Sequence, residues 1–368
     1  MSAQSLFPLI SPLSACSARS AKYMLFAITV LLTAMLAAIP AAFSQEKTEI
    51  DIWSTTDTAA FESVIRAFET ANPDIEIAYH EITTNALFEH VLYARDRKDT
   101  AIDLVISSAM DLQVKLVNEG LASPFSTDRA GATPSWAEWR NELYGFTYEP
   151  IVLVYNKEAF RGYPLPKTHS DLADLLINNL PTFEEKVGTY DAASSGAGYL
   201  FFTQDAIQSD KIFRVIEALS RAKMRTYDYT SAILDAVASG DLILGYNVIG
   251  TYALERASKD PNVGIFQFKD YTIVMSRTAF IYKHSRKKRE AERFLEFLLS
   301  ETGQEKMARD SALIPISPDM RRLKLPADST NAYLPIKMGI GLLTYQDPLK
   351  RRYFLDVWNS IFKKPEEQ

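Results

Sequence analysis

Residues with hydroxyl or amide side chains, together with one glycine, lie at the ends of four segments that the sequence predicts as strands. They are Thr55, Thr56, Ser107, Ser108, Ser194, Ser195, Gly196, Tyr246 and Asn247. Ligands of open α/β sheets bind at the carboxyl ends of strands, where the following helices present backbone N–H groups and a positive dipole end. Any one of these residues could instead cap a helix. Four such strand ends, two in each half of the chain, favour a ligand-binding cleft.

Arginine and tyrosine side chains supply further candidates for this cleft. The arginines that could pair with a negatively charged ligand are Arg225, Arg277 and Arg140, and we include Arg225 in the predicted site. The tyrosines that could stack on a ligand are Tyr148, Tyr229 and Tyr271. Exposed arginines and core tyrosines are common in proteins, so each of these residues also has a purely structural explanation.

No pattern typical of an enzyme occurs in the sequence. It contains no Gly-x-Ser-x-Gly nucleophile elbow, no phosphate-binding P-loop and no glycine-rich dinucleotide motif. The four histidines are well separated and lack the spacing of metal ligands. An exported hydrolase that uses Asp191 or Asp205 with a histidine is the alternative, but no nucleophile–base pair supports it. We therefore expect a binding protein rather than an enzyme, with no cofactor and no metal.

The N-terminal segment has the pattern of a secretory signal peptide. Arg19 and Lys22 precede an uncharged run over residues 24–39, and small residues follow that run. A membrane-spanning helix needs about 20 apolar residues, so an uncleaved anchor is the weaker alternative. We predict that residues 1–44 are removed on export to the periplasm. The single cysteine, Cys16, would leave with them, which suits an oxidising compartment.

Length and charge limit the partners of the exported chain. The sequence has 368 residues, and a chain of this length typically forms two domains. Residues 1–44 hold two basic and no acidic residues, so the exported chain has a formal net charge of −8. A mildly acidic protein favours neither nucleic acid nor an anionic membrane surface. We expect a monomer that binds a small molecule.

Hydrophobic periodicity predicts an α/β protein. The segments with the pattern of strands are residues 49–53, 75–82, 102–106, 146–155, 185–191, 242–246 and 271–283. The segments with the pattern of helices are residues 61–68, 85–97, 112–119, 199–206, 247–257 and 289–309. Alternation of this kind implies parallel pairing and right-handed crossovers.

Several segments resemble, in family order, the extracellular solute-binding proteins of ABC importers, specifically the ferric-iron and related group 1 type. The similar segments are residues 67–75, 102–108, 152–157, 194–196, 240–247 and 294–300, followed by Gly303 and Gln304. Each match is loose, but together they extend over roughly residues 48–315. The resemblance implies a two-lobed type II periplasmic-binding fold, with hinge crossovers between two mixed-sheet domains.

The resemblance also implies domain boundaries. Lobe 1 would comprise residues 45–147 and 278–320, and lobe 2 would comprise residues 148–277. The chain would cross between the lobes at these boundaries, and closure would be a hinge motion. Residues 321–368 would form a C-terminal helical segment that packs on the lobes.

The resemblance to iron-binding members is incomplete at the ligand site. Those members use a pair of adjacent tyrosines just after the strand that is predicted here to end at Tyr246 and Asn247. In this chain, Tyr252 is the one tyrosine among residues 248–252, so the pair is missing. An iron site needs several hard anionic oxygen ligands, so ferric iron is the weaker alternative. Hydroxyl groups and helix N-termini suit an anionic or phosphorylated organic ligand, as in the phosphoglycerate and sugar-phosphate relatives.

These observations together predict a periplasmic solute-binding protein that delivers its ligand to an ABC transporter permease. A receptor that reports the ligand to a membrane sensor kinase is the alternative role. If the predicted cleft is correct, replacing Ser195 and Asn247 together by alanine abolishes ligand binding and leaves the stability of the free protein nearly unchanged.

Overall fold

A computed structural model describes residues 47–97, 101–126, 133–325 and 332–362 of the chain. The predicted signal peptide, residues 1–44, and Cys16 within it lie outside these ranges. Among the helices of the described ranges, none combines the length and the apolar character that crossing a membrane requires.

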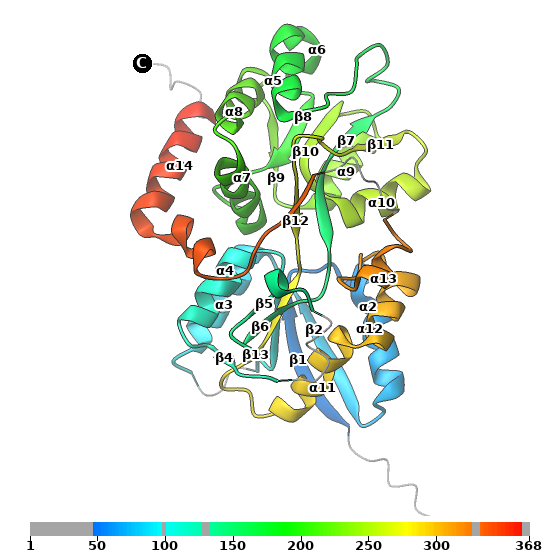
Figure 1. The fold of residues 1–368 in the computed structure, drawn as a ribbon, viewed down its shortest axis with the longest axis vertical. Coiled ribbons are helices and arrows are strands. Elements are labelled where there is room, and N and C mark those ends of the chain that lie inside the picture. Colours follow the sequence, from blue (N-terminus) through cyan, green and yellow to red (C-terminus); the bar gives the residue numbers. More distant parts are fainter. Residues whose placement is uncertain (1–46, 98–100, 127–132, 326–331, 363–368) are drawn as a thin grey trace, which may run out of the picture. The chain divides into compact units, whose positions relative to one another are not determined.

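The described residues form two mixed β-sheets of seven strands each (Figure 1). The first sheet contains, in spatial order, β2 (Ile75–Glu81), β1 (Thr48–Ser54), β3 (Leu104–Ser107), β13 (Thr278–Tyr282), β6 (Leu143–Gly145) and β5 (Glu138–Trp139), with β4 (Ala122–Ser123) beside β13. Strand β1 pairs in parallel with β2 and β3, whereas β13 runs antiparallel to β3. The helices on this sheet are α2 (Thr58–Ala71), α3 (Thr84–Ala94), α4 (Met110–Asn118), α11 (Lys288–Leu299) and α12 (Glu301–Asp310). We call this half lobe 1.

The second sheet belongs to the other half, which we call lobe 2. Its strands are β14 (Tyr333–Pro335), β12 (Thr272–Met275), β7 (Glu149–Asn156), β10 (Leu244–Ile249), β8 (Val187–Tyr190) and β9 (Arg225–Tyr227), with β11 (Val263–Phe266) beside β7. Its helices are α5 (His169–Asn178), α6 (Leu180–Phe183), α7 (Gly196–Gln208), α8 (Ile212–Arg221), α9 (Thr230–Ala238), α10 (Gly250–Lys259) and α14 (Pro348–Phe362). The remaining short helices are η2 (Ser135–Ala137), α13 (Pro318–Arg321) and η3 (Ile340–Gln346).

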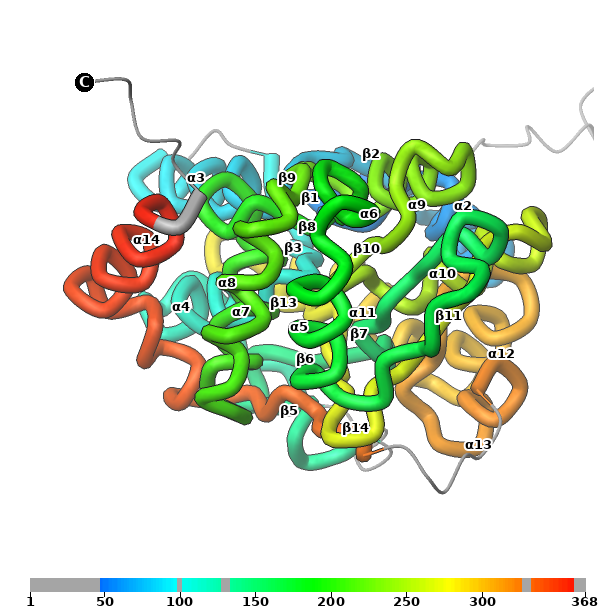
Figure 2. The backbone as a smooth tube through the Cα atoms, turned by 90° about the horizontal axis from the view of Figure 1, so that it is seen from above, coloured from blue at the N-terminus to red at the C-terminus, as the bar shows by residue number. Residues whose placement is uncertain are grey.

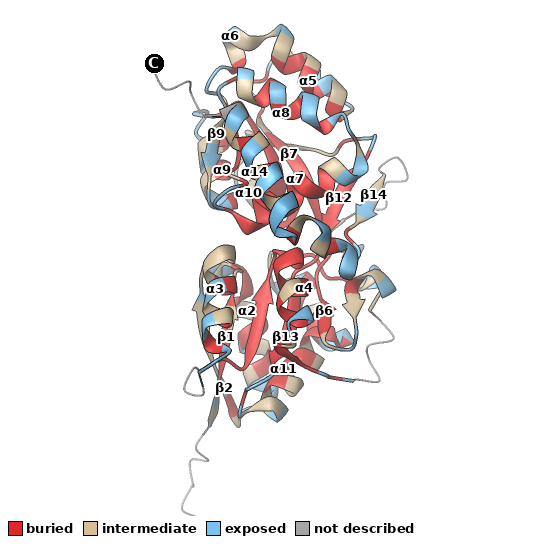
Figure 3. Cartoon of the chain, turned by 90° about the vertical axis from the view of Figure 1, so that its left-hand side faces the viewer, coloured by how far each residue is buried: buried red, intermediate tan, exposed pale blue. Residues whose placement is uncertain are grey.

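Each lobe buries apolar residues at the spacing that the sequence shows. In α2, Phe61, Val64 and Phe68 are fully buried because they recur on one face of the helix. Phe294 of α11 packs edge-on against Phe68, with ring centroids 4.9 Å apart. Figure 3 shows the central strands of both sheets as buried and the exposed residues mainly on the helices and edge strands. The periodicity therefore identifies the core of each lobe.

The chain crosses between the lobes at two adjacent segments, residues 146–148 and 276–277, and a third time between α12 of lobe 1 and β14 of lobe 2. The Phe146 amide donates to the Arg277 carbonyl at 3.0 Å, and the Arg277 amide donates to the Thr147 hydroxyl at 2.7 Å. This crossing corrects one prediction. The strand expected over residues 271–283 is two strands in different sheets, because Ser276 and Arg277 leave the second sheet and enter the first.

Two further predictions differ from the structure in detail. The helix expected over residues 289–309 is broken between α11 and α12, where the Ser300 hydroxyl accepts from the Gly303 amide and caps the second helix. The C-terminal segment contributes strand β14 to the second sheet as well as helix α14. Helix η3 contacts α4 of lobe 1, and α14, at one side of Figure 2, contacts α8 of lobe 2.

Candidate functional site

A pocket of about 250 Å³ lies between the lobes and is lined by residues of both. Lobe 1 contributes Thr55, Asp57, Glu81, Ile82, Thr83, Thr84 and Ser108. Lobe 2 contributes Tyr190, Ser194, Ser195, Ala197, Asp228, Tyr229, Thr230, Ile249 and Tyr252, and Arg277 comes from the crossing segment. Small-molecule sites are usually about 300–1,000 Å³, so this pocket suits a small metabolite.

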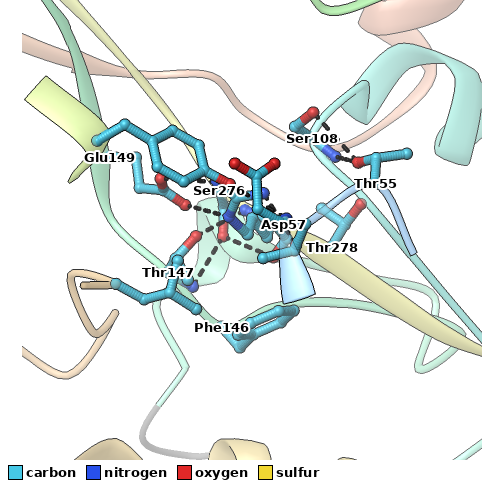
Figure 4. Close-up of polar contacts among 12 residues, drawn as sticks. Thr55, Asp57, Ser108, Phe146, Thr147, Glu149, Ser276 and Thr278 are labelled. Carbon is cyan, nitrogen blue, oxygen red and sulfur yellow. Dashed lines mark hydrogen bonds and ion pairs between the residues drawn. The ribbon is translucent and has the colours of Figure 1, made fainter. Parts of the chain in front are cut away.

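Two neighbouring strand ends form the lobe 1 wall of the pocket. Strands β1 and β3 are parallel neighbours, so Thr55 and Ser108 follow them at the same edge of the sheet. The Ser108 amide donates to the Thr55 hydroxyl at 3.0 Å, a contact that Figure 4 shows. The hydroxyls of the two residues are 3.4 Å apart. The structure thus brings together two of the residues predicted from the sequence.

The lobe 2 wall is built at the start of helix α7. The Ser195 hydroxyl accepts from the Gly198 amide at 3.1 Å and caps this helix, and the side chain is almost fully buried. The Ser194 hydroxyl donates to the Asp228 carboxylate at 2.9 Å. Both serines line the pocket, as the sequence predicts for a strand end that faces a ligand.

The lobes touch directly beside these serines. The Gly196 amide donates to the Thr84 hydroxyl at 2.9 Å, and the Asn85 side chain donates to the Ser194 carbonyl at 2.6 Å. A Cβ at Gly196 would lie 2.9 Å from Leu112 and 3.0 Å from the Thr84 hydroxyl. Gly196 therefore permits the close approach of the lobes and, contrary to its predicted role, does not line the pocket.

A buried ion pair stands behind the pocket at the crossing segments. The Arg277 Nε is 2.9 Å from the Glu149 carboxylate, and both side chains are essentially inaccessible to water. The guanidinium also donates to the Thr56 hydroxyl at 2.9 Å and faces the Tyr252 ring at 5.2 Å. Burial, the largest single influence, lowers the pKa of Arg277, but Glu149, Tyr252, Tyr79 and Asp57 together raise it, and the net shift is upward. Figure 4 shows Thr147, Glu149 and Ser276 gathered at this crossing.

Asp57 is a carboxylate of the pocket that interacts electrostatically with Arg277. It precedes helix α2 but gives no side-chain cap to it, and its amide donates to the Tyr252 hydroxyl at 3.3 Å. Burial raises the pKa of Asp57, the Arg277 guanidinium lowers it, and Glu81 raises it further, with a net upward shift. The Asp57 side chain is thus half-buried at the pocket, and the positive charge of Arg277 offsets only part of the effect of burial on its pKa.

Five of the predicted site residues, besides Gly196, do not line the pocket. Thr56 and Ser107 lie behind it, where Thr56 accepts from Arg277 and Ser107 accepts from the Ala109 amide. Tyr246 and Asn247 donate to the buried Asp205 at 3.0 and 2.9 Å and belong to the core of lobe 2. Arg225 pairs with the exposed Asp241 at 2.8 Å.

Sequence reasoning missed the carboxylates and two of the tyrosines of the pocket. Asp57 directly follows Thr55 and Thr56, and Glu81 ends a strand that was predicted, so the same strand-end rule could have found both. Asp228 and Tyr252 had no comparable signal, because a tertiary contact places each of them at the pocket. Within the described ranges, no group of three or more His, Cys, Asp or Glu residues is placed to hold a metal ion.

Comparisons with known proteins agree with this two-lobed architecture. Residues 63–333 match the family model described as bacterial extracellular solute-binding protein. The substrate-binding protein of an ABC transporter from Agrobacterium tumefaciens is 33% identical, with 88% of this chain and 96% of that chain covered and a TM-score of 0.80. None of the curated proteins matches the chain.

Two more distant structures show the same fold. The periplasmic binding protein AfuA from Actinobacillus pleuropneumoniae, with exogenous fructose-6-phosphate bound, is 17% identical with a TM-score of 0.72. The alignment covers 86% of this chain and 99% of the AfuA chain. Iron-bound HitA from Pseudomonas aeruginosa is 19% identical with a TM-score of 0.67. The alignment covers 85% of this chain and 99% of the HitA chain. The predicted fold class is confirmed.

Proposed function

Because the chain belongs to the bacterial extracellular solute-binding protein family, we propose that it captures a small solute in the pocket between its lobes and delivers it to an ABC transporter permease. The observation that carries this proposal is that side chains of both lobes line one pocket. A ligand there contacts both walls at once, so it stabilises the arrangement in which the lobes are together.

The crossing segments provide the hinge for such closure. Residues 146–148 and 276–277 lie next to each other and connect the two sheets through few residues, which is where a hinge motion concentrates its backbone changes. The contacts of Thr84 with Gly196 and of Asn85 with Ser194 form only while the lobes are together. Ligand binding and these contacts therefore favour the same closed state.

Location and partner follow from the family and the sequence. A periplasmic protein exported by residues 1–44 suits an extracellular solute-binding family. The permease is the partner because the Agrobacterium tumefaciens relative serves an ABC transporter. Delivery to a sensor kinase and a monomeric state stay predictions from the sequence.

The anionic or phosphorylated ligand predicted from the sequence also stays a prediction. The AfuA structure with bound fructose-6-phosphate is in its favour, whereas HitA holds iron, and both relatives are too distant to assign a ligand. The pocket itself is a better guide to the ligand than either relative.

Solute capture is tested on protein purified after export from a bacterial host. The protein is incubated with a small-molecule extract of cells and medium, separated from free solutes, denatured, and the released molecules are identified by mass spectrometry. We expect one solute or a narrow chemical class to be released at close to one molecule per chain. Release of nothing above a bovine albumin control would reject the proposal.

Two neighbouring exposed residues give a matched pair of variants. Ser194 lines the pocket, whereas Ala193 does not, and both are exposed. Ser194→Trp introduces a large ring at the pocket and should abolish capture, while Ala193→Trp should retain it. Both variants should keep the melting temperature of the ligand-free protein within a few degrees. Equal capture by the two variants would show that the solute binds elsewhere.

A further inference from the structure

The formal charges that line the pocket are mainly negative. Among the described lining residues, Asp57, Glu81 and Asp228 carry carboxylates, and Arg277 carries the one positive charge. Asp57 is half-buried, while Glu81 and Asp228 are exposed at the mouth. Carboxylates at the mouth of a cleft attract cations and repel anions during approach.

The single cation among the described lining residues is already paired with a buried carboxylate. Arg277 is 1% exposed and its Nε lies 2.9 Å from the fully buried Glu149 carboxylate. Its remaining N–H groups include one that donates to Thr56 at 2.9 Å. An anion that displaced Glu149 from this guanidinium would leave a buried carboxylate without its partner, which is strongly unfavourable.

Backbone N–H groups at three helix N-termini of the pocket already donate to side chains of the protein. At α2, the Thr58 amide donates to the Glu81 carboxylate at 2.7 Å. At α4, the Ser108 amide donates to Thr55, and at α7 the Gly196 amide donates to Thr84. A helix N-terminus binds an anion through free N–H groups, and at these three helices side chains of the protein already accept from one such group. Helices α9 and α10 also begin at the pocket and have no side-chain cap.

The groups that remain suit a positively charged ligand. The Asp57 carboxylate is partly desolvated, so a cation beside it would gain a charge-assisted hydrogen bond at a site shielded from water. Tyr229 and Tyr252 line the same pocket, and the faces of aromatic rings attract ammonium groups; one face of Tyr252 already carries the Arg277 guanidinium. The acceptors and the rings belong to different lobes, so a cation between them would draw the lobes together.

We propose that the solute carries an ammonium or guanidinium group, held between the Asp57 carboxylate and the tyrosine rings of the opposite lobe. The proposal rests on the proposed capture function and replaces the anionic ligand expected from the sequence. The volume of about 250 Å³ limits the solute to a small amine rather than a long polymer or peptide.

The test measures binding of defined probes by isothermal titration and thermal shift. The amine probes are putrescine, agmatine, ethanolamine and choline, and the comparison probes are fructose 6-phosphate, 3-phosphoglycerate, citrate, mannitol and ferric citrate. We expect at least one amine to raise the melting temperature and to bind with an affinity that falls as salt concentration rises. We expect no shift with the anions.

Two variants with the same change in net charge locate the binding site. Asp57→Asn should weaken the amine that binds by about 10- to 100-fold, because it removes a hydrogen bond to a charged group. Asp241→Asn removes an exposed carboxylate that pairs with Arg225 outside the pocket and should leave the affinity unchanged. Equal affinities of the two variants would reject the proposed site.

The remaining outcomes separate this proposal from the capture function. Binding of an anion, mannitol or ferric citrate with no binding of any amine would reject the amine class and leave solute capture intact. If no probe binds and the mass-spectrometric assay also releases nothing, both proposals are wrong. If that assay releases a solute without a basic nitrogen, only the amine class is wrong.

Discussion

Two groups of polar residues at strand ends lie in different environments: one lines the pocket and the other is buried in a core. After β1 and β3, Thr55 and Ser108 reach the pocket and contact each other. On β10, Tyr246 and Asn247 turn into the core of lobe 2 and donate to Asp205. The residue types and their positions in the sequence pattern are similar, so polarity after a predicted strand does not by itself identify a ligand site.

The difference lies in where the strand ends. Strand β10 continues to Ile249, and its register against β7 shifts between Gly245 and Val248. Asn247 lies within this irregularity with a φ of 59°, a left-handed conformation that asparagine tolerates better than most residues. The residues that reach the pocket from this side are Ile249 and Tyr252, further along the chain.

The largest effect should come from the ion pair behind the pocket. Arg277→Met leaves Glu149 buried and unpaired, so the free energy of unfolding should fall by about 3–5 kcal/mol. The double variant Arg277→Met/Glu149→Leu should recover most of this loss, since no unpaired charge remains. Urea denaturation followed by circular dichroism measures both. A loss below about 1 kcal/mol in Arg277→Met would show that the pair contributes little.

Asn247 should have an intermediate effect, on stability and not on binding. Asn247→Ala removes a hydrogen bond to the buried Asp205 and should lower the free energy of unfolding by about 1–3 kcal/mol. This replaces the expectation that Asn247 holds the ligand. Asn247→Gly tolerates the positive φ and separates the lost amide from backbone strain. Unchanged stability with lost solute capture would restore Asn247 to the binding site.

The smallest effect should come from pH. Acid should raise the stability of the fold through the buried Asp111 and weaken ligand binding through Asp57 at the pocket. Burial raises the pKa of Asp111 to about 6, while its contact with Gln346 lowers it in part. Since the folded pKa lies above its ordinary value, the stabilisation is complete below the ordinary pKa and is lost as pH rises through about 6. Going from pH 7 to pH 5 should therefore add about 1 kcal/mol through this group.

Comparison with Asp111→Asn isolates that contribution. The difference in unfolding free energy between wild type and variant should change over this pH range in the stated direction, and a constant difference would contradict it. Amine binding should weaken as pH falls, because the raised pKa of Asp57 makes it protonate at a higher pH than an ordinary aspartate. Acid thus favours the fold at Asp111 and opposes binding at Asp57.

Much of the fold could be predicted because local patterns set it. The apolar spacing of Phe61, Val64 and Phe68 predicts a helix with one buried face, and α2 has that face. The predicted strand over residues 271–283 fails because β12 and β13 are almost continuous in sequence and differ only in the sheet they join. Local periodicity reports that a segment is extended, and it does not report which neighbour supplies its hydrogen bonds.

The sequence by itself determined the α/β class, the order of the elements and the resemblance to solute-binding proteins. Only the tertiary structure decided which polar residues share the pocket, because Thr55, Ser195 and Tyr252 are far apart in the chain and meet through the packing of two lobes. It also decided the charge of the site. Arg277 is a cation in the sequence, but it pairs with the buried Glu149, and burial raises the pKa of Asp57 at the pocket.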